Sequence, residues 1–159
     1  MTAEGVEWGP AAYDWVPDGW MVGLVRPPPL TALASFREGL FYLQDPSTLL
    51  AVSELGALPG ESVLDLCAAP GGKATAIAQF MNNTGRITAF DPDSARRALI
   101  RENVERLGIT NVRIPEGRPT RPGEMFDRIL IDAPCSNTGV MRRRAELRWR
   151  ITAAEVTRL

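Results

Sequence analysis

Apolar residues in this chain form short continuous runs that alternate with segments of helical spacing. The runs are typical of strands buried on both faces, and we predict four of them, at Val63–Leu66, Arg86–Phe90, Asn111–Ile114 and Phe126–Asp132. An alanine-rich helix begins at Gly72 or Lys73, and another runs from Asp93 or Ser94 to Leu107. This alternation predicts an α/β fold with a parallel sheet, and right-handed crossovers give the strand order third, second, first, fourth.

Two further helical features follow from the same pattern. Asp45 and Pro46 form a helix start, an N-cap acid followed by proline at the first helical position, and Gly56 can end that helix. In the helix that ends at Leu107, the apolar residues lie on one face, and we expect the arginines to form the solvated face, at Arg96, Arg97, Arg101 and Arg106.

The amino-terminal 35 residues differ in composition from the rest of the chain. They contain three tryptophans, several glycines and the run Pro27–Pro29. We interpret residues 1–35 as an irregular arm that packs through its aromatic side chains. A partly disordered leader is the alternative.

Composition limits the possible functions. The chain has 159 residues, which suffices for one domain, and its net charge of −1 gives no general attraction to nucleic acid. It contains no histidine and two cysteines, so it lacks the commonest general base, and a structural zinc site is disfavoured. No apolar run approaches the roughly 20 residues of a membrane span, and no secretory signal is present, so we expect a cytoplasmic protein with reduced thiols.

The segment after the first predicted strand has the character of a ligand loop. Pro70, Gly71 and Gly72 turn the chain sharply and allow a ligand to approach the backbone. The loop matches neither the phosphate-loop consensus nor the dinucleotide fingerprint. Lys73, at its end, is the only lysine among 18 basic residues. The alternative is a purely structural turn between strand and helix.

Acidic residues follow the second and fourth predicted strands. Asp91 lies 19 residues after Gly72, at the end of the second strand, where such folds bind ribose hydroxyls, although it could also be a turn acid before Pro92. Asp132 and Cys135 follow the fourth strand. An ionised thiol can add to an electron-poor ring carbon, although a cysteine after a strand is more often a packed small residue. We expect these residues to face the glycine loop across the crevice between the first and fourth strands.

Three segments together carry a family resemblance: FREGLFYLQDPS, DLCAAPGGK and FDRILIDAPCSNTGVMRR. They resemble the Sun/Fmu family of S-adenosylmethionine-dependent RNA (cytosine-5) methyltransferases over about residues 36–151. The resemblance implies a Rossmann-like class I methyltransferase fold. Residues 36–159 would then be a partial methyltransferase domain, the cofactor-binding half, with the C-terminal strands missing.

The resemblance also implies roles for individual residues. The methionine part of the cofactor would be surrounded by Cys67, Ala68, Ala69, Pro70, Gly71, Gly72 and Lys73. Asp91 would bind the ribose, and Glu116 would lie near the adenine, although Ile114-Pro115-Glu116 replaces the usual Gly-Asp. Asp132 would lie beside both the cofactor and the target cytosine, and Lys73 close to the reacting base.

The family uses two thiols, and Cys135 matches the one that assists product release. The attacking cysteine lies some tens of residues further on in the family, beyond Leu159. Two alternatives therefore stay open. The chain could be a catalytically incomplete cofactor- and RNA-binding or assembly module, or Cys135 could itself attack, as the corresponding thiol does in DNA cytosine-5 methyltransferases.

The expected partner is an rRNA or a tRNA. A basic and aromatic patch suited to unpaired RNA follows the Pro-Cys turn, at Arg142, Arg143, Arg144, Arg148 and Trp149, although it could also be a solvated loop. The fourth strand lacks neighbours at its outer edge, so self-association or a partner chain is a further expectation.

Overall fold

A computed structural model describes residues 4–133, together with 149, 152 and 154. Its central feature is a parallel sheet of the strands β3 (Ser62–Leu66), β4 (Arg86–Phe90), β5 (Val112–Arg113) and β6 (Arg128–Ile131). The strands lie in the order β5-β4-β3-β6, which confirms the order predicted from right-handed crossovers. The third and fourth strands are shorter than predicted, because only their central residues pair with β4 and β3.

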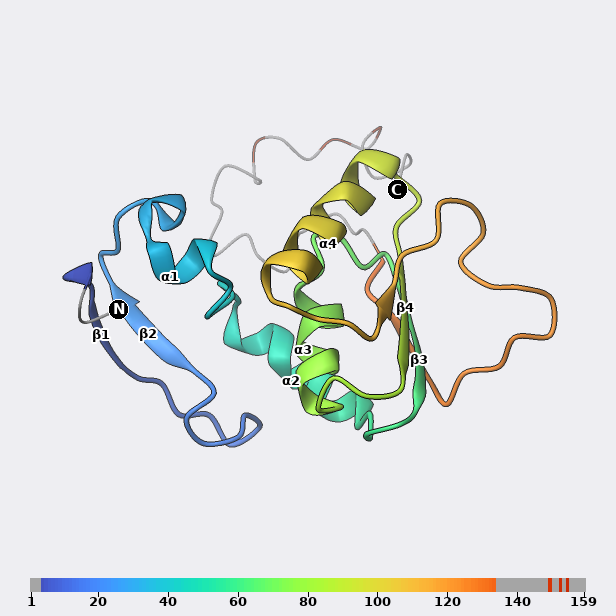
Figure 1. The fold of residues 1–159 in the computed structure, drawn as a ribbon, viewed down its shortest axis with the longest axis horizontal. Helices are drawn as coiled ribbons and strands as arrows, with labels where there is room; N and C mark the ends of the chain where they lie inside the picture. Colours follow the sequence, from blue (N-terminus) through green and yellow to red (C-terminus); the bar gives the residue numbers. More distant parts are fainter. Residues whose placement is uncertain (1–3, 134–148, 150–151, 153, 155–159) are drawn as a thin grey trace.

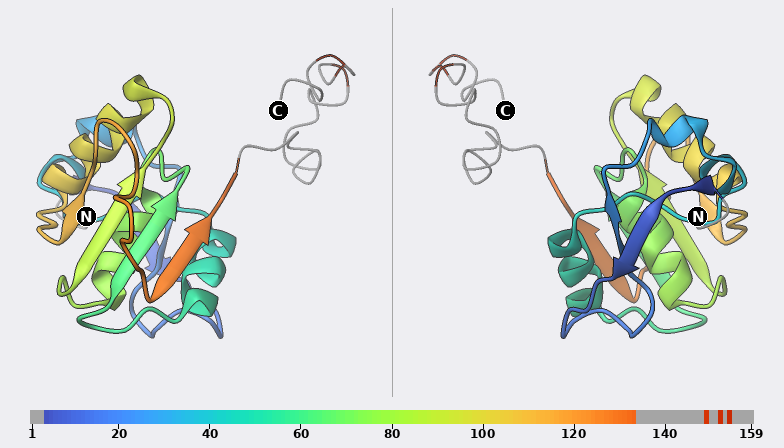
Figure 2. Two further views of the ribbon diagram at one scale, coloured as in Figure 1. Left: turned by 90° about the vertical axis from the view of Figure 1, so that its right-hand side faces the viewer. Right: turned by 90° about the vertical axis from the view of Figure 1, so that its left-hand side faces the viewer.

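Three helices cover one face of this sheet, α2 (Pro46–Leu55), α3 (Gly72–Phe80) and α4 (Ser94–Arg106), and the loop from β5 to β6 runs on the other side (Figures 1 and 2). The predicted caps are confirmed. The Asp45 carboxylate accepts the Ser47 amide at 2.9 Å, Asp93 accepts the amide of Ala95, and Gly56 ends α2 in the left-handed conformation. Because the four strands are parallel, their carboxyl ends all lie at the same edge of the sheet.

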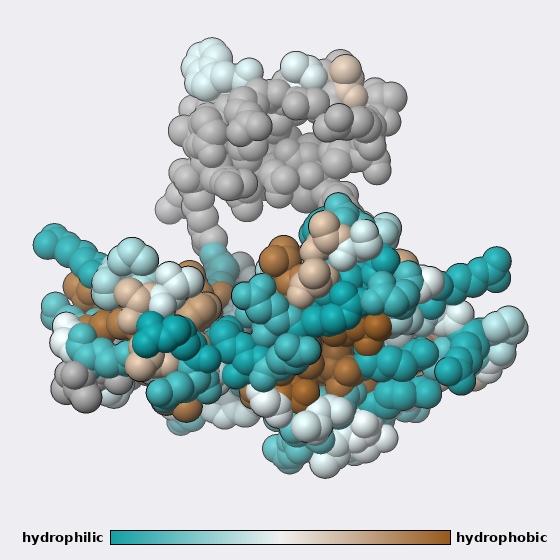
Figure 3. Space-filling model, turned by 45° about the horizontal axis from the view of Figure 1, so that its top comes forward, coloured by the Kyte–Doolittle hydropathy of each residue, from teal (hydrophilic) through white to brown (hydrophobic). Residues whose placement is uncertain are grey.

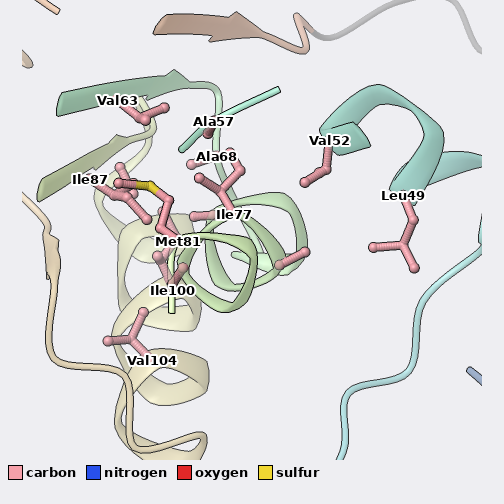
Figure 4. Packing of buried hydrophobic residues seen from close by; sticks show 14 of the residues in the cluster. Leu49, Val52, Ala57, Val63, Ala68, Ile77, Met81, Ile87, Ile100 and Val104 are labelled. Atoms are coloured by element: carbon pink, nitrogen blue, oxygen red, sulfur yellow. The ribbon is translucent and has the colours of Figure 1, made fainter. Parts of the chain in front are cut away.

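The core lies between α3 and the sheet. Ile77 of α3 and Met81, which caps the end of that helix, are fully buried against Val63 and Ile87 of the strands, and Ile100 of α4 completes the layer (Figure 4). Small alanines on α3 allow this close approach, and three of them are almost completely buried. The packing fixes the first turn of α3 next to the carboxyl end of β3, which is where the predicted ligand loop lies.

The amino-terminal segment is more regular than predicted. β1 (Glu7–Pro10) pairs antiparallel with β2 (Val22–Val25), and the short helices η2 (Leu30–Ala32) and α1 (Ala34–Arg37) follow. The expectation of an irregular arm was wrong for this hairpin, because four-residue strands rich in glycine and proline leave almost no alternating pattern.

Aromatic side chains join this segment to the rest of the chain, as its composition suggested. The Trp20 and Phe80 rings lie 4.7 Å apart, and Trp15 packs against the hydrophobic core.

Two of the four arginines expected on the solvated face of α4 pack inward, which corrects that prediction. Arg97 is 6% exposed. Arg106 stacks on the Phe36 ring at 4.0 Å and donates to the carbonyls of Phe36 and Phe41. Backbone carbonyls replace water around both guanidinium groups, so a charged side chain can leave the solvent here.

Hydrophilic side chains cover much of the face drawn in Figure 3, with hydrophobic residues visible in its recesses. Among the described residues, no helix is long and apolar enough to span a membrane.

Candidate cofactor-binding site

The loop between β3 and α3 is shaped by its backbone. Gly71 adopts φ +108°, a conformation that side chains disfavour, and its amide donates to the Ala68 carbonyl at 2.7 Å. The peptide bond between Ala69 and Pro70 is cis. The first amides of α3 have no partner within the helix and point back toward the loop, where they favour a negatively polarised group.

Gly72 is required by a neighbour from the segment that precedes α2. A β-carbon at this position would lie 3.0 Å from a ring carbon of Tyr42 and 3.2 Å from its hydroxyl. The Tyr42 ring is therefore packed directly on the first residue of α3. This contact brings the segment before α2 over the glycine loop.

A cavity of about 250 Å³ lies between these two segments. One wall comes from the predicted loop, through Cys67, Ala68, Ala69, Pro70, Gly72 and Lys73, and the other from Tyr42, Leu43, Gln44, Asp45 and Thr48. The residues of the second wall were not predicted as site residues. The only indication was that residues 42–45 belong to FREGLFYLQDPS, one of the three segments that carry the family resemblance, and no chemical role was predicted for that segment.

The crevice expected between the first and fourth strands brings Lys73 and Asp132 together. The Lys73 ammonium donates to the Asp132 carboxylate at 2.5 Å, and both residues line the cavity. The prediction that the glycine loop faces the turn after β6 is therefore confirmed at Asp132. Cys135 lies outside the described residues.

Asp65, the fourth of the five residues of β3, is a site residue that sequence reasoning missed. It is completely buried, lines the cavity, and neither carboxylate oxygen has a hydrogen-bond partner among the described residues. Burial raises the pKa of Asp65 to about 7, the Lys73 charge opposes this rise, and Asp132 adds to it. The available signal was an acid within an apolar strand run, which has to be explained by a partner or a ligand.

Cys67 does not have the environment of a nucleophile. Burial raises the pKa of its thiol, the nearby Asp91 carboxylate raises it further, and Arg96 only partly opposes these effects. The thiol is therefore protonated at neutral pH, and a protonated thiol neither attacks a ring carbon nor binds a metal well.

Asp91 and Glu116 lie outside the residues that line this cavity. Asp91 follows β4 and is 1% exposed, with one oxygen accepting the Asp93 amide at 3.1 Å and the other 3.5 Å from the Arg96 guanidinium. The Glu116 side chain is 74% exposed and forms ion pairs with Arg97 and Arg101. Their roles at the ribose and the adenine stay predictions.

Of the residues predicted to bind RNA, only Trp149 is among those that the structure describes. Trp149 is 87% exposed, whereas Arg142, Arg143, Arg144 and Arg148 lie outside the described residues. Within the described part of the chain, no group of three or more histidine, cysteine, aspartate or glutamate side chains could hold a metal ion.

Comparison with known proteins then decides the family. The family model described as 16S rRNA methyltransferase RsmB/F matches residues 52–159. The chain belongs to this family. It is 41% identical over 135 residues to the probable ribosomal RNA small subunit methyltransferase B of Synechocystis, covering 82% of this chain and 30% of the relative. The corresponding enzyme of Enterobacter is 38% identical, with 92% of this chain and 34% of the relative covered.

Solved structures agree with the fold. A methyltransferase homologue from Pyrococcus horikoshii superposes with a TM-score of 0.71 at 36% identity, covering 89% of this chain and 47% of that protein. The fold is therefore that of a class I methyltransferase, and S-adenosylmethionine is the methyl donor of the family. The chain spans about a third of the length of the curated relatives it matches.

Proposed function

We propose that this chain forms the S-adenosylmethionine-binding part of an enzyme that methylates carbon 5 of cytosine in RNA, most specifically in small-subunit rRNA. The observation that carries the proposal is the contact of Lys73 with Asp132, at 2.5 Å, in a cavity that also contains the buried carboxylate of Asp65. This contact joins the glycine loop to the turn after β6. Two segments that the resemblance assigns to cofactor and substrate thus share one site.

The charges of the cavity suit the amino-acid end of the cofactor. Three carboxylates line the cavity, from Asp45, Asp65 and Asp132, against the single positive charge of Lys73, so the site favours a cation. The cofactor has two cationic groups, an ammonium and a sulfonium. We assign the ammonium to Asp65, because that carboxylate is buried and has no hydrogen-bond partner in the described chain.

The remaining roles follow the family. Asp91 binds the ribose hydroxyls and Glu116 lies at the adenine side. Asp132 and Lys73 face the target cytosine, while Cys135 assists release of the product. The arginines from Arg142 to Arg148, with Trp149, bind unpaired RNA that presents its base out of the stack. Such an enzyme would act in the cytoplasm.

Calorimetric titration of the 159-residue chain with S-adenosylmethionine tests the proposal. We expect saturable binding that S-adenosylhomocysteine competes away, and a loss of about tenfold or more in affinity for Asp132→Asn, which removes one of the negative charges that face the cationic end of the cofactor. The matched control is Glu61→Gln, which removes the ion pair of Glu61 with Arg128 at the opposite end of the same two strands. A folded chain that does not bind the cofactor would refute the proposal.

A non-catalytic assembly role is favoured by one observation. β6 forms an edge of the described sheet, and Ile129 and Ile131 are 54% and 63% exposed there. Exposed apolar strands at a sheet edge pair with other chains. If this edge serves self-association, sedimentation should show a concentration-dependent dimer that Ile129→Lys abolishes, and a monomer at every concentration would contradict it.

A further inference from the structure

Arg97 connects two loops that lie on either side of the proposed nucleoside site. Its guanidinium donates to the carbonyls of Asp91 at 2.6 Å and Pro92 at 3.1 Å, in the turn after β4. The same guanidinium donates to the carbonyl of Glu116 at 3.0 Å, in the segment after β5. One side chain therefore holds the main chain of both loops.

The burial of this side chain makes the link stiff. Arg97 is 6% exposed and stacks over the Phe90 ring at 5.4 Å, so the plane of its guanidinium is fixed from one side. A buried charge is tolerated only when it is paired, and here three carbonyls and the Glu116 carboxylate, at 3.6 Å, pair with the two terminal nitrogens of the guanidinium, while its Nε has no hydrogen-bond partner among the described residues. If the loops moved apart, the charge would lose these partners.

The neighbouring residues do not duplicate this link. Arg96 lies beside the Asp91 carboxylate and donates to the Ala69 carbonyl at 3.3 Å, and therefore joins Asp91 to the glycine loop instead. Arg101 contacts only the Glu116 carboxylate among the polar groups described. Arg97 alone joins the ribose-side turn to the adenine-side segment in the described structure.

We propose that Arg97 is a positioning residue for the nucleoside of the cofactor: it sets the separation between Asp91 and Glu116, so that ribose and adenine are bound together. The inference rests on the proposed function, since it presupposes that the nucleoside binds between these loops. Arg97 acts through the backbone of the two loops and makes no hydrogen bond to the Asp91 carboxylate, one oxygen of which has no hydrogen-bond partner among the described residues. Lysine could not replace it, because a single ammonium cannot span the three carbonyls that the planar guanidinium reaches.

The test compares two ligands on four proteins. S-adenosylhomocysteine and its 2′-deoxyribosyl analogue are titrated calorimetrically into the wild-type chain and into Arg97→Met, Arg97→Lys and Arg101→Met. Thermal unfolding of the ligand-free proteins is followed in parallel by circular dichroism. Arg101→Met is the matched control, because it removes an arginine from the same helix and the same Glu116 but leaves every main-chain contact of Arg97.

We expect both Arg97 variants to bind S-adenosylhomocysteine about tenfold more weakly. The preference for the ribose over the 2′-deoxyribose ligand should fall toward one in these variants, because Asp91 is no longer aligned. Arg101→Met should keep both values within about twofold. Arg97→Lys keeps the positive charge and the apolar stem, so it provides a folded variant if the methionine substitution prevents folding.

Two outcomes would overturn the inference while the proposed function stands. In the first, wild type binds the cofactor product and the Arg97 variants bind it equally well. In the second, the variants lose the same factor for both ligands, which would mean that Arg97 supports the fold without aligning the ribose site. A folded wild-type chain that binds neither ligand would refute the proposed function itself.

Discussion

Replacement of Asp65 by asparagine should stabilise the chain at alkaline pH while weakening cofactor binding. In the ligand-free protein this carboxylate is completely buried without a hydrogen-bond partner in the described chain, and its pKa is raised from 3.8 to about 7. The folded state therefore holds a proton that the unfolded chain releases above pH 3.8. Stability is fully present below that pH and is lost as the pH rises through 7.

The size of this loss of stability follows from the difference between the pKa of Asp65 in the folded and in the unfolded state. Three pKa units correspond to about 4 kcal/mol, an upper limit for the cost of ionising Asp65 in the folded state. The asparagine amide would be buried as well, at a cost of about 1–3 kcal/mol. Asp65→Asn should therefore raise the free energy of unfolding by about 1–3 kcal/mol at pH 8 and not at pH 4.

Cofactor binding should respond in the opposite direction. If the ionised carboxylate binds the ammonium of S-adenosylmethionine, a pKa of about 7 makes the wild-type affinity about tenfold weaker at pH 6 than at pH 8. Asp65→Asn should bind weakly at both pH values and lose this dependence.

Urea unfolding and calorimetry at several pH values measure the two effects, with Glu105→Gln, an exposed acid of α4, as the control. Destabilisation by Asp65→Asn at pH 8, or unchanged affinity, would refute this account of the site.

Three further substitutions test other parts of the structure. Gly72→Ala should weaken cofactor binding several-fold, because its methyl group would lie 3.0 Å from the Tyr42 ring and push that wall away; unchanged calorimetric affinity would contradict this. Arg106→Met should destabilise the chain by about 1–3 kcal/mol in urea, because two backbone carbonyls and the Phe36 ring lose their partner; an unaltered midpoint would argue against that role. If Cys135 is the attacking thiol, RNA containing 5-fluorocytosine should form an adduct in the presence of S-adenosylmethionine, because methyl transfer to carbon 5 leaves no proton for the elimination that would release the thiol. Cys135→Ser should abolish this adduct on a denaturing gel, and an adduct that persists would assign the attack elsewhere.

Local signals and a handedness rule were sufficient to predict most of the fold. The strand order and the contact of Lys73 with Asp132 both follow from where apolar runs end and from right-handed crossovers. The burial of Arg97 could not be predicted, because its partners are backbone carbonyls 5, 6 and 19 residues away, and carbonyls leave no trace in a side-chain pattern. Asp65 was overlooked for a related reason. Its position within an apolar strand run was a signal, but its role becomes clear only from the cavity that it lines together with the glycine loop and the segment before α2.

The single lysine of the chain offers the most direct test of the central claim, that the glycine loop and the turn after β6 form one cofactor site. Selective ¹⁵N-lysine labelling gives one backbone amide signal, from Lys73, at the start of α3. Titration with S-adenosylmethionine should move this signal saturably in the wild-type chain, and Asp132→Asn should require a higher cofactor concentration to reach the same shift. A Lys73 signal that stays in place in the folded protein at millimolar cofactor would contradict the account.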